Sequence, residues 1–228
     1  MPNLDTQVAR IMGAIPGPVG IGHAPAWQGE ITDKADGLMA IPSLLDLGLM
    51  YGVEDPLGRG YGQLLEKVLA KLGKERGGKF YNYREGQLGP DRIRLHEDVR
   101  KLREELENAV PYIEQKVRFL IVPVSTGRHY QGFSPRNARV DALELGGLPL
   151  DPITVAMILI AWPERLNKYP QTVIDCPGAE YSWNAGGEWT GSCYFDFSGG
   201  RLRFSAGGAD SPDGDCGAAV AFPGVPAA

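Results

Sequence analysis

The chain carries one segment that is apolar on every side, between Asp151 and Trp162, and this segment constrains the fold most. Asp151 is a good N-cap residue, and Pro152 suits the first helical position because it needs no hydrogen-bond partner there. Pro163 is expected to end or kink the helix. A helix without a polar face must be covered on all sides, so the sequence predicts that the rest of the chain packs around it.

Short β-rich runs lie on both sides of this helix. Residues 117–124 are almost continuously apolar and residues 172–174 are largely β-branched, so both are predicted strands. Further on, Gly186-Gly187 and Gly199-Gly200 stand where hairpin turns are expected. The sequence therefore predicts an α+β fold, in which a helical N-terminal half is followed by a mixed or antiparallel sheet packed on the buried helix.

Apolar residues at helical spacing predict helices near residues 4–12, 42–51, 61–74 and 91–110. The last is expected to be the longest, and it carries one apolar seam: Leu95, Val99, Leu102, Leu106 and Ala109. We expect this seam to pack on the body of the domain, with a homodimer formed through the helix as the alternative. The chain is expected to be a single domain, 1–228, helical over about residues 1–112 and sheet-containing over about 113–228.

Two further segments lack a clear period. Residues 13–36 are rich in Gly and Pro and are expected to form an extended cover anchored by Trp27 and Ile31, with His23 as an isolated solvated side chain. Residues 79–90 are expected to connect two helices and to pack through their own aromatic side chains. Aromatic residues interleaved with Lys and Arg are also typical of surfaces that bind single-stranded nucleic acid.

The cysteine content and the N-terminus bear on the compartment. Three widely spaced cysteines, Cys176, Cys193 and Cys216, are typical of reduced thiols rather than of a disulfide framework. The N-terminus lacks the pattern of a signal peptide, and no apolar run is long enough to span a membrane. We therefore expect a cytoplasmic protein without a membrane partner. No metal or cofactor motif is present, so neither group is expected.

The formal net charge of −5 is unevenly distributed along the chain. Residues 59–139 hold 17 bases and 10 acids, an excess of +7, while both flanks are acidic. Such an excess can attract a polyanion, although Lys and Arg that alternate with Glu along helices usually form a solvated face. Binding of nucleic acid along residues 67–103 is therefore a hypothesis that ranks below a solvated surface.

The polar segment after the first predicted strand is the best candidate site. Residues 125–139 are expected to form a loop at the carboxyl end of that strand, where functional side chains often lie. Arg128, Arg136 and Arg139 could hold a phosphate or carboxylate, and His129 could titrate near neutral pH. The alternative is a surface loop whose arginines pair with the acidic flanks. The leading hypothesis is a binding or interaction protein without catalysis, which holds an anionic small molecule or a protein partner.

An enzyme is the alternative from another class. The usual catalytic motifs are missing, but His129 could act with Asp175 or Cys176 if the strands that carry them are neighbours. A buried, unreactive cysteine is the commoner case, and Asp175 also suits a turn around Pro177. Four residues have the character of a sugar-binding face or, more commonly, of a small core: Trp183, Asn184, Trp189 and Tyr194.

Five runs of sequence resemble an uncharacterised bacterial family found mostly in genomes of uncultivated candidate phyla: FLIVPVSTGRHYQGFSPRNAR, PITVAMILIAWPERL, VIDCPGAEY, FDF and GRLRF. The similarity covers about residues 87–222. It implies a shared fold, and it favours the 125–139 segment and Asp175 as positions to test. No activity is attached to the family, so the resemblance implies no role for these residues.

Overall fold

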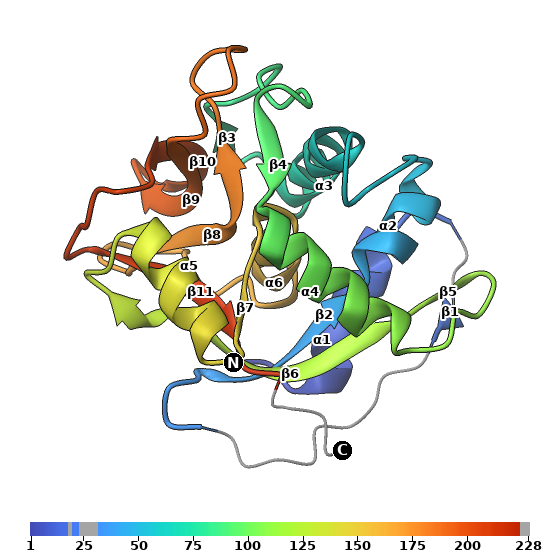
Figure 1. The fold of residues 1–228 in the computed structure, drawn as a ribbon. Helices are drawn as coiled ribbons and strands as arrows, with labels where there is room; N and C mark the ends of the chain where they lie inside the picture. Colours follow the sequence, from blue (N-terminus) through green and yellow to red (C-terminus); the bar gives the residue numbers. More distant parts are fainter. Residues whose placement is uncertain (18–19, 23–31, 224–228) are drawn as a thin grey trace.

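The computed structural model describes residues 1–17, 20–22 and 32–223, and it confirms the predicted α+β class. The described residues form six helices, a nine-stranded mixed sheet and a separate pair of short strands (Figure 1). The helices are α1 (Leu4–Ala14), α2 (Leu44–Tyr51), α3 (Tyr61–Glu75), α4 (Glu97–Asn108), α5 (Pro135–Glu144) and α6 (Pro152–Ala161). The strands are β1 (Gly20–Ile21), β2 (Gly37–Pro42), β3 (Phe80–Asn82), β4 (Ile93–Leu95), β5 (Lys116–Val117), β6 (Phe119–Gln131), β7 (Leu148–Pro149), β8 (Val173–Tyr181), β9 (Gly191–Ser198), β10 (Arg201–Gly208) and β11 (Cys216–Ala221).

The large sheet has the strand order β2-β6-β11-β8-β9-β10-β3, with β4 paired to β8 and β7 paired to β11. It is mixed because β11 runs parallel to β8 and β3 parallel to β10, while the other pairs are antiparallel. The free edge of β2 is covered by α1, where the buried Gln7 amide accepts from the N–H of Ala40 and donates to the C=O of Leu38. This side chain replaces a neighbouring strand and closes the edge.

Helix α6 lies at the centre of the molecule (Figure 1), and each of its ten residues is buried. Asp151 caps it, as predicted, by accepting from the N–H groups of Ile153 and Thr154. The helix packs against α1, α3, β2 and β8. Because it has no polar face, its burial on all sides organises the main core between the helical layer and the sheet.

The opposite face of the sheet carries a second, smaller core under α5. Tyr130 of β6 and Val220 of β11 pack there against Ala138 and Ala142 of the helix. Ser134 starts the helix by accepting from the N–H of Asn137, and Pro135 occupies the first turn. The predicted Gly199-Gly200 hairpin is confirmed, because it joins β9 to β10 in antiparallel register.

The prediction of one long helix over residues 91–110 is wrong at its start. Residues 93–95 form β4, in which buried Ile93 and Leu95 flank exposed Arg94, and the helix begins only at Glu97. The longest helix is α3, with 15 residues. Leu95 fits both a strand alternation and a helical seam, so spacing alone could not separate them. The predicted connector over 79–90 likewise contains the short strand β3.

Within α4, the apolar seam contacts the chain's own core. Val99 is buried, and Leu102 and Leu106 pack against the main cluster. This is the first of the two interpretations of the seam. The extended cover around Trp27 and Ile31, together with His23, lies outside the described residues.

The described part of the chain contains no helix with the length and apolar character that crossing a membrane requires. Its three cysteines are free thiols, two of them buried in the sheet and the third, Cys216, partly exposed.

Candidate functional site

Residues 125–139, predicted to be a polar loop, are instead the second half of β6 followed by the start of α5. A bulge explains the difference: Ala218 of β11 pairs with Tyr130 and the next residue, Ala219, pairs with Thr126. Gly127, Arg128 and His129 between them are extra residues on the β6 side, so the polar sequence continues the sheet with a local irregularity.

The three predicted arginines have separate partners in the structure. Arg128 donates to the backbone C=O groups of Asp33 and Ala35, at 2.7 and 2.9 Å. Arg136 forms an ion pair with Asp210, with 2.6 Å between Nε and Oδ1. Each guanidinium thus joins its own element to a neighbouring loop. This arrangement corresponds to the alternative in which the arginines pair locally.

Arg139 is buried and belongs to a charged network under α5. Its guanidinium donates to the C=O of Pro177 at 3.2 Å and to Glu180 at 3.4 Å. Glu180 also accepts from Arg94, at 2.9 Å, so one carboxylate joins two guanidiniums. Desolvation lowers the pKa of Arg139, and the nearby Glu180 carboxylate opposes that shift. These contacts link α5, β8 and β4 inside the fold.

His129, Asp175 and Cys176 are not joined by any hydrogen bond or ion pair in the described parts of the chain. His129 packs edge-on against Tyr130 and Phe222, and burial lowers its pKa. Cys176 points into the main core, where burial raises its thiol pKa well above the ordinary value. Asp175 is the preceding strand residue, so its side chain points to the opposite face of the sheet.

Asp175 is the most perturbed carboxyl group of the protein's described part. Its side chain is 6% exposed, and desolvation, with a smaller contribution from Asp213, raises its pKa from 3.8 to about 7. Its strand neighbours are Tyr194 on β9 and Ala218 on β11. The group is therefore partly protonated near neutral pH, which is common at functional sites but also occurs in structural positions.

A cleft of about 400 Å³ brings together three other arginines, Arg59, Arg94 and Arg100. They come from three elements: the turn between α2 and α3, strand β4 and the first turns of α4. We call this the arginine cleft, and it is lined by Asp55, Leu57, Gly58, Arg59, Pro90, Ile93, Arg94, Leu95, Glu97 and Arg100. Its volume suits a small ligand or one residue of a polymer.

The turn that presents Arg59 is fixed by its own backbone. The carbonyl of Asp55 accepts from the N–H groups of Gly58 and Gly60, and its carboxylate accepts from the N–H of Arg59 at 2.7 Å. A Cβ atom on Gly60 would lie 1.9 Å from the carbonyl oxygen of Glu54, so only glycine fits there. The position of Arg59 is therefore set by a tight turn rather than by a flexible loop.

The three guanidiniums differ in how far they are engaged. Arg94 donates to Glu180 and lies 4.1 Å from the ring centroid of Trp189. Arg100 pairs with Glu104 at 2.8 Å, with both side chains 39% exposed. The guanidinium of Arg59 forms no hydrogen bond or ion pair with the described residues. Arg59 is therefore the group with its full set of donors available to a ligand.

The start of α4 adds to the positive potential of the arginine cleft. Glu97, its first residue, lines the cleft, and the N-cap residue His96 makes no side-chain capping bond. The first N–H groups of a helix carry partial positive charge, which favours an anion. Glu97 itself is paired with Lys101 at 2.8 Å, and this pairing offsets its negative charge.

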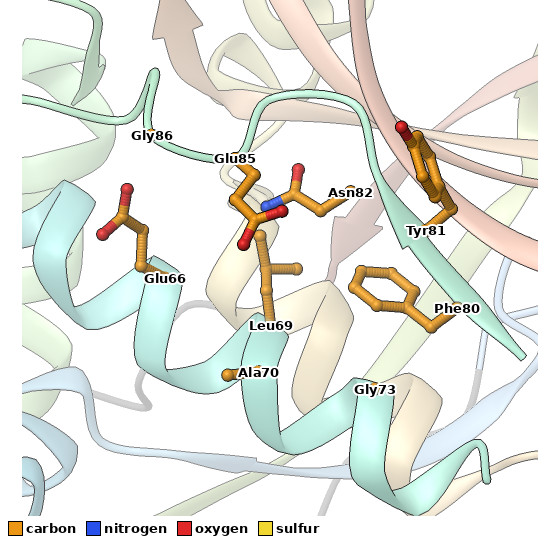
Figure 2. A pocket seen from close by; sticks show the side chains of 9 residues that line it. All are labelled: Glu66, Leu69, Ala70, Gly73, Phe80, Tyr81, Asn82, Glu85 and Gly86. Atoms are coloured by element: carbon orange, nitrogen blue, oxygen red, sulfur yellow. The ribbon is translucent and has the colours of Figure 1, made fainter. Parts of the chain in front are cut away.

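A second hollow, of about 360 Å³, has the opposite character (Figure 2). It lies between α3 and β3 above an apolar floor that includes Leu69 and Phe80, and Figure 2 shows Glu85 and Asn82 meeting above Leu69 with Glu66 across from them. Two carboxylates favour a cation here. This hollow therefore differs in charge from the arginine cleft, whose lining carries three arginines beside Asp55 and Glu97.

The chain was compared with protein-family models, with curated proteins and with solved structures, and no match was found. The resemblance to a bacterial family therefore stays a prediction. Sequence reasoning missed Arg59, Arg94 and Arg100 as a group. The basic excess that begins at Arg59 was a signal for them, but the assembly of a turn, a strand and a helix around one cleft is visible only in the fold.

Proposed function

We propose that this protein binds an anionic ligand, one that presents a phosphate or carboxylate group, in the arginine cleft. The observation that carries the proposal is that Arg59, Arg94 and Arg100 line one cleft, and that the Arg59 guanidinium has no partner among the described residues. Guanidinium groups recognise both anions through two parallel hydrogen bonds. The proposal keeps the anion-binding role expected from the sequence and places it away from Arg128, Arg136 and Arg139, which have local partners.

Isothermal titration with pyrophosphate and with citrate tests the proposal. Arg59→Ala should weaken binding by about 10- to 100-fold, because a charge-assisted hydrogen bond is lost from an otherwise intact cleft. Arg59→Lys should restore part of the affinity, since it keeps the charge but loses the planar fork. Arg136→Ala is the matched control, because it removes a partly exposed arginine that lies outside the cleft.

The Arg136→Ala control also shows which result would refute the proposal. Equal affinities of wild type and Arg59→Ala, together with a loss in Arg136→Ala, would move the site to α5 and refute the arginine cleft. Both variants should melt within a degree or two of wild type, because exposed substitutions of this kind change stability by less than about 0.5 kcal/mol.

A second candidate function is acid–base catalysis at Asp175, favoured by the raised pKa of about 7. A carboxyl group that is half-protonated near neutral pH can both give and take a proton. A screen of ester, amide and phosphate hydrolysis with wild type and Asp175→Asn tests it. Activity that disappears in the variant supports catalysis, and a screen without activity dependent on Asp175 removes this candidate.

A further inference from the structure

The arginine cleft continues into a row of aromatic and arginine side chains that begins at Arg94. This arginine lines the cleft and also stacks on Trp189, at 4.1 Å from the ring centroid. Arg92, two residues earlier, donates to the backbone carbonyls of Ser182 and Trp183. Figure 1 shows the segment before β4 beside the loop that follows β8, at the top of the molecule. The contacts thus lead from the cleft to Trp183.

From Trp183 the row continues to strand β3. The guanidinium of Arg84 lies 5.2 Å from the centroid of the Trp183 ring. Tyr83, which precedes Arg84 in the sequence, packs edge-on against Tyr81, with 4.6 Å between the ring centroids. Arg203 of β10 lies 5.9 Å from the Tyr83 ring. We call this row the aromatic ridge, and it consists of Tyr81, Tyr83, Arg84, Arg92, Arg94, Trp183, Trp189 and Arg203.

Three of the four rings of the ridge are exposed, and the fourth, Trp189, is half-buried. Tyr81, Tyr83 and Trp183 are 46%, 50% and 44% exposed, which is unusual for large aromatic side chains. Tyr81 also lines the second hollow, at the end away from Glu66 (Figure 2). Exposed rings alternating with guanidiniums form a surface that fits a ligand with both flat rings and negative charges.

We infer that the anion in the arginine cleft is a phosphate of single-stranded nucleic acid, whose neighbouring bases stack on the aromatic ridge. The inference rests on the proposed function, because the cleft supplies the phosphate contact. Sites for single strands combine a positive groove along the backbone with aromatic side chains under successive bases. Duplex DNA keeps its bases stacked inside the helix, so it would leave the rings of the ridge unused.

Fluorescence anisotropy with a labelled 12-nucleotide oligothymidylate, a 12-nucleotide oligouridylate and a duplex of the same length tests the inference. We expect both single strands to bind more tightly than the duplex, with affinity that falls as salt rises. Trp183→Ala should weaken oligonucleotide binding by about 5- to 150-fold, as expected when one stacked base is lost, and leave pyrophosphate binding unchanged. Arg59→Ala should weaken the binding of both ligands.

Two further variants keep the experiment decisive. Trp183→Phe retains a ring and should recover most of the affinity lost in Trp183→Ala, whereas a merely misfolded variant would show a lower melting temperature. Arg136→Ala outside the cleft and ridge should bind like wild type. Weaker oligonucleotide binding by Arg136→Ala, together with wild-type binding by Trp183→Ala, would overturn the inference.

The binding measurements distinguish a failure of the nucleic-acid inference from a failure of the proposed anion site. If pyrophosphate binding depends on Arg59 but oligonucleotides bind no more tightly than pyrophosphate, the cleft is an anion site and the nucleic-acid inference is wrong. If neither pyrophosphate nor citrate nor an oligonucleotide binds, both fall, and the exposed rings are better explained as a protein interface. Oligonucleotide binding that is indifferent to Arg59→Ala would also refute the inference, because it would separate the ridge from the cleft.

Discussion

The phenol hydroxyl of Tyr61 donates a 3.0 Å hydrogen bond to the carboxylate of Asp151, and both side chains are buried. The same carboxylate accepts from the N–H groups of Ile153 and Thr154 and from the Thr154 hydroxyl. One acid therefore caps α6 and joins it to the start of α3. Burial, helped by Asp151, raises the pKa of Tyr61 well above its usual value, so the hydroxyl remains a donor.

Asp151→Ala is expected to destabilise the protein by about 2–4 kcal/mol, because α6 loses its cap and the Tyr61 hydroxyl is buried without a partner. Tyr61→Phe removes only the donor and should cost about 1 kcal/mol. Urea unfolding measures both. The control is Asn3→Ala, which removes the exposed cap of α1 and should cost no more than about 1 kcal/mol. An Asp151→Ala protein as stable as the control would contradict this account.

A buried ion pair between Asp46 and Arg118 holds α2 to the chain between β5 and β6. Asp46 accepts from the backbone N–H, Nε and Nη2 of Arg118, at 2.8, 2.9 and 2.7 Å. Asp46→Ala should cost about 3–5 kcal/mol in urea unfolding, because it leaves the guanidinium buried without its counter-charge. Glu75→Ala breaks the more exposed pair with Lys71 and should change stability by less than about 0.5 kcal/mol. Similar losses of unfolding free energy in Asp46→Ala and Glu75→Ala would show that burial does not determine how much an ion pair contributes to stability.

The raised pKa of Asp175 predicts that stability falls between acid and neutral pH. The unfolded chain loses this proton near the ordinary value of 3.8, while the folded protein keeps it until about pH 7. Over this interval the folded state binds more protons, so each rise in pH favours unfolding. The contribution of Asp175 is fully favourable below pH 3.8, and about 4 kcal/mol of it is lost by pH 7.

Asp175→Asn tests this directly, because the amide has nearly the same shape and cannot ionise. The variant should be more stable than wild type at pH 8, by up to about 4 kcal/mol, and nearly equal to it at pH 4. Urea unfolding at pH 4, 6 and 8 measures the difference. Asp210→Asn, which changes an exposed acid, is the control. A difference between Asp175→Asn and wild type that stays constant across this range would show that the carboxyl titrates normally.

Local patterns in the sequence were enough to predict several elements. The N-cap Asp151, the following Pro152 and a continuous apolar run predict α6 because each signal acts within one helix. The Gly199-Gly200 pair predicts the β9–β10 hairpin, because glycine readily adopts the positive φ that such turns require. In the structure both glycines have positive φ, 58° and 76°. The class of the fold follows from these elements.

The arginine cleft could not be predicted in this way. Its guanidiniums belong to a turn, a three-residue strand and a helix, and their meeting depends on the pairing of β4 with β8, far along the chain. The segment 125–139 was misjudged for a related reason. Its Gly and Arg residues suggest a loop, but β11, which lies near the C-terminal end of the chain, pairs with it around a bulge. Long-range pairing overrides local composition in both places.

Gly60 links the stability of the turn to anion binding. Its N–H donates to the carbonyl of Asp55, and a Cβ atom there would overlap the carbonyl oxygen of Glu54. Gly60→Ala should therefore displace the turn that presents Arg59, destabilise the protein by about 1–3 kcal/mol and weaken pyrophosphate binding. Gly13→Ala is the control: no atom of the described residues lies within 4 Å of its Cβ position in α1, so the substitution should stabilise the helix by about 0.5–1 kcal/mol and leave binding unchanged. Calorimetry measures the stability of both variants, and isothermal titration measures their affinity for pyrophosphate. Wild-type pyrophosphate affinity in Gly60→Ala would mean that the tight turn is not what positions Arg59.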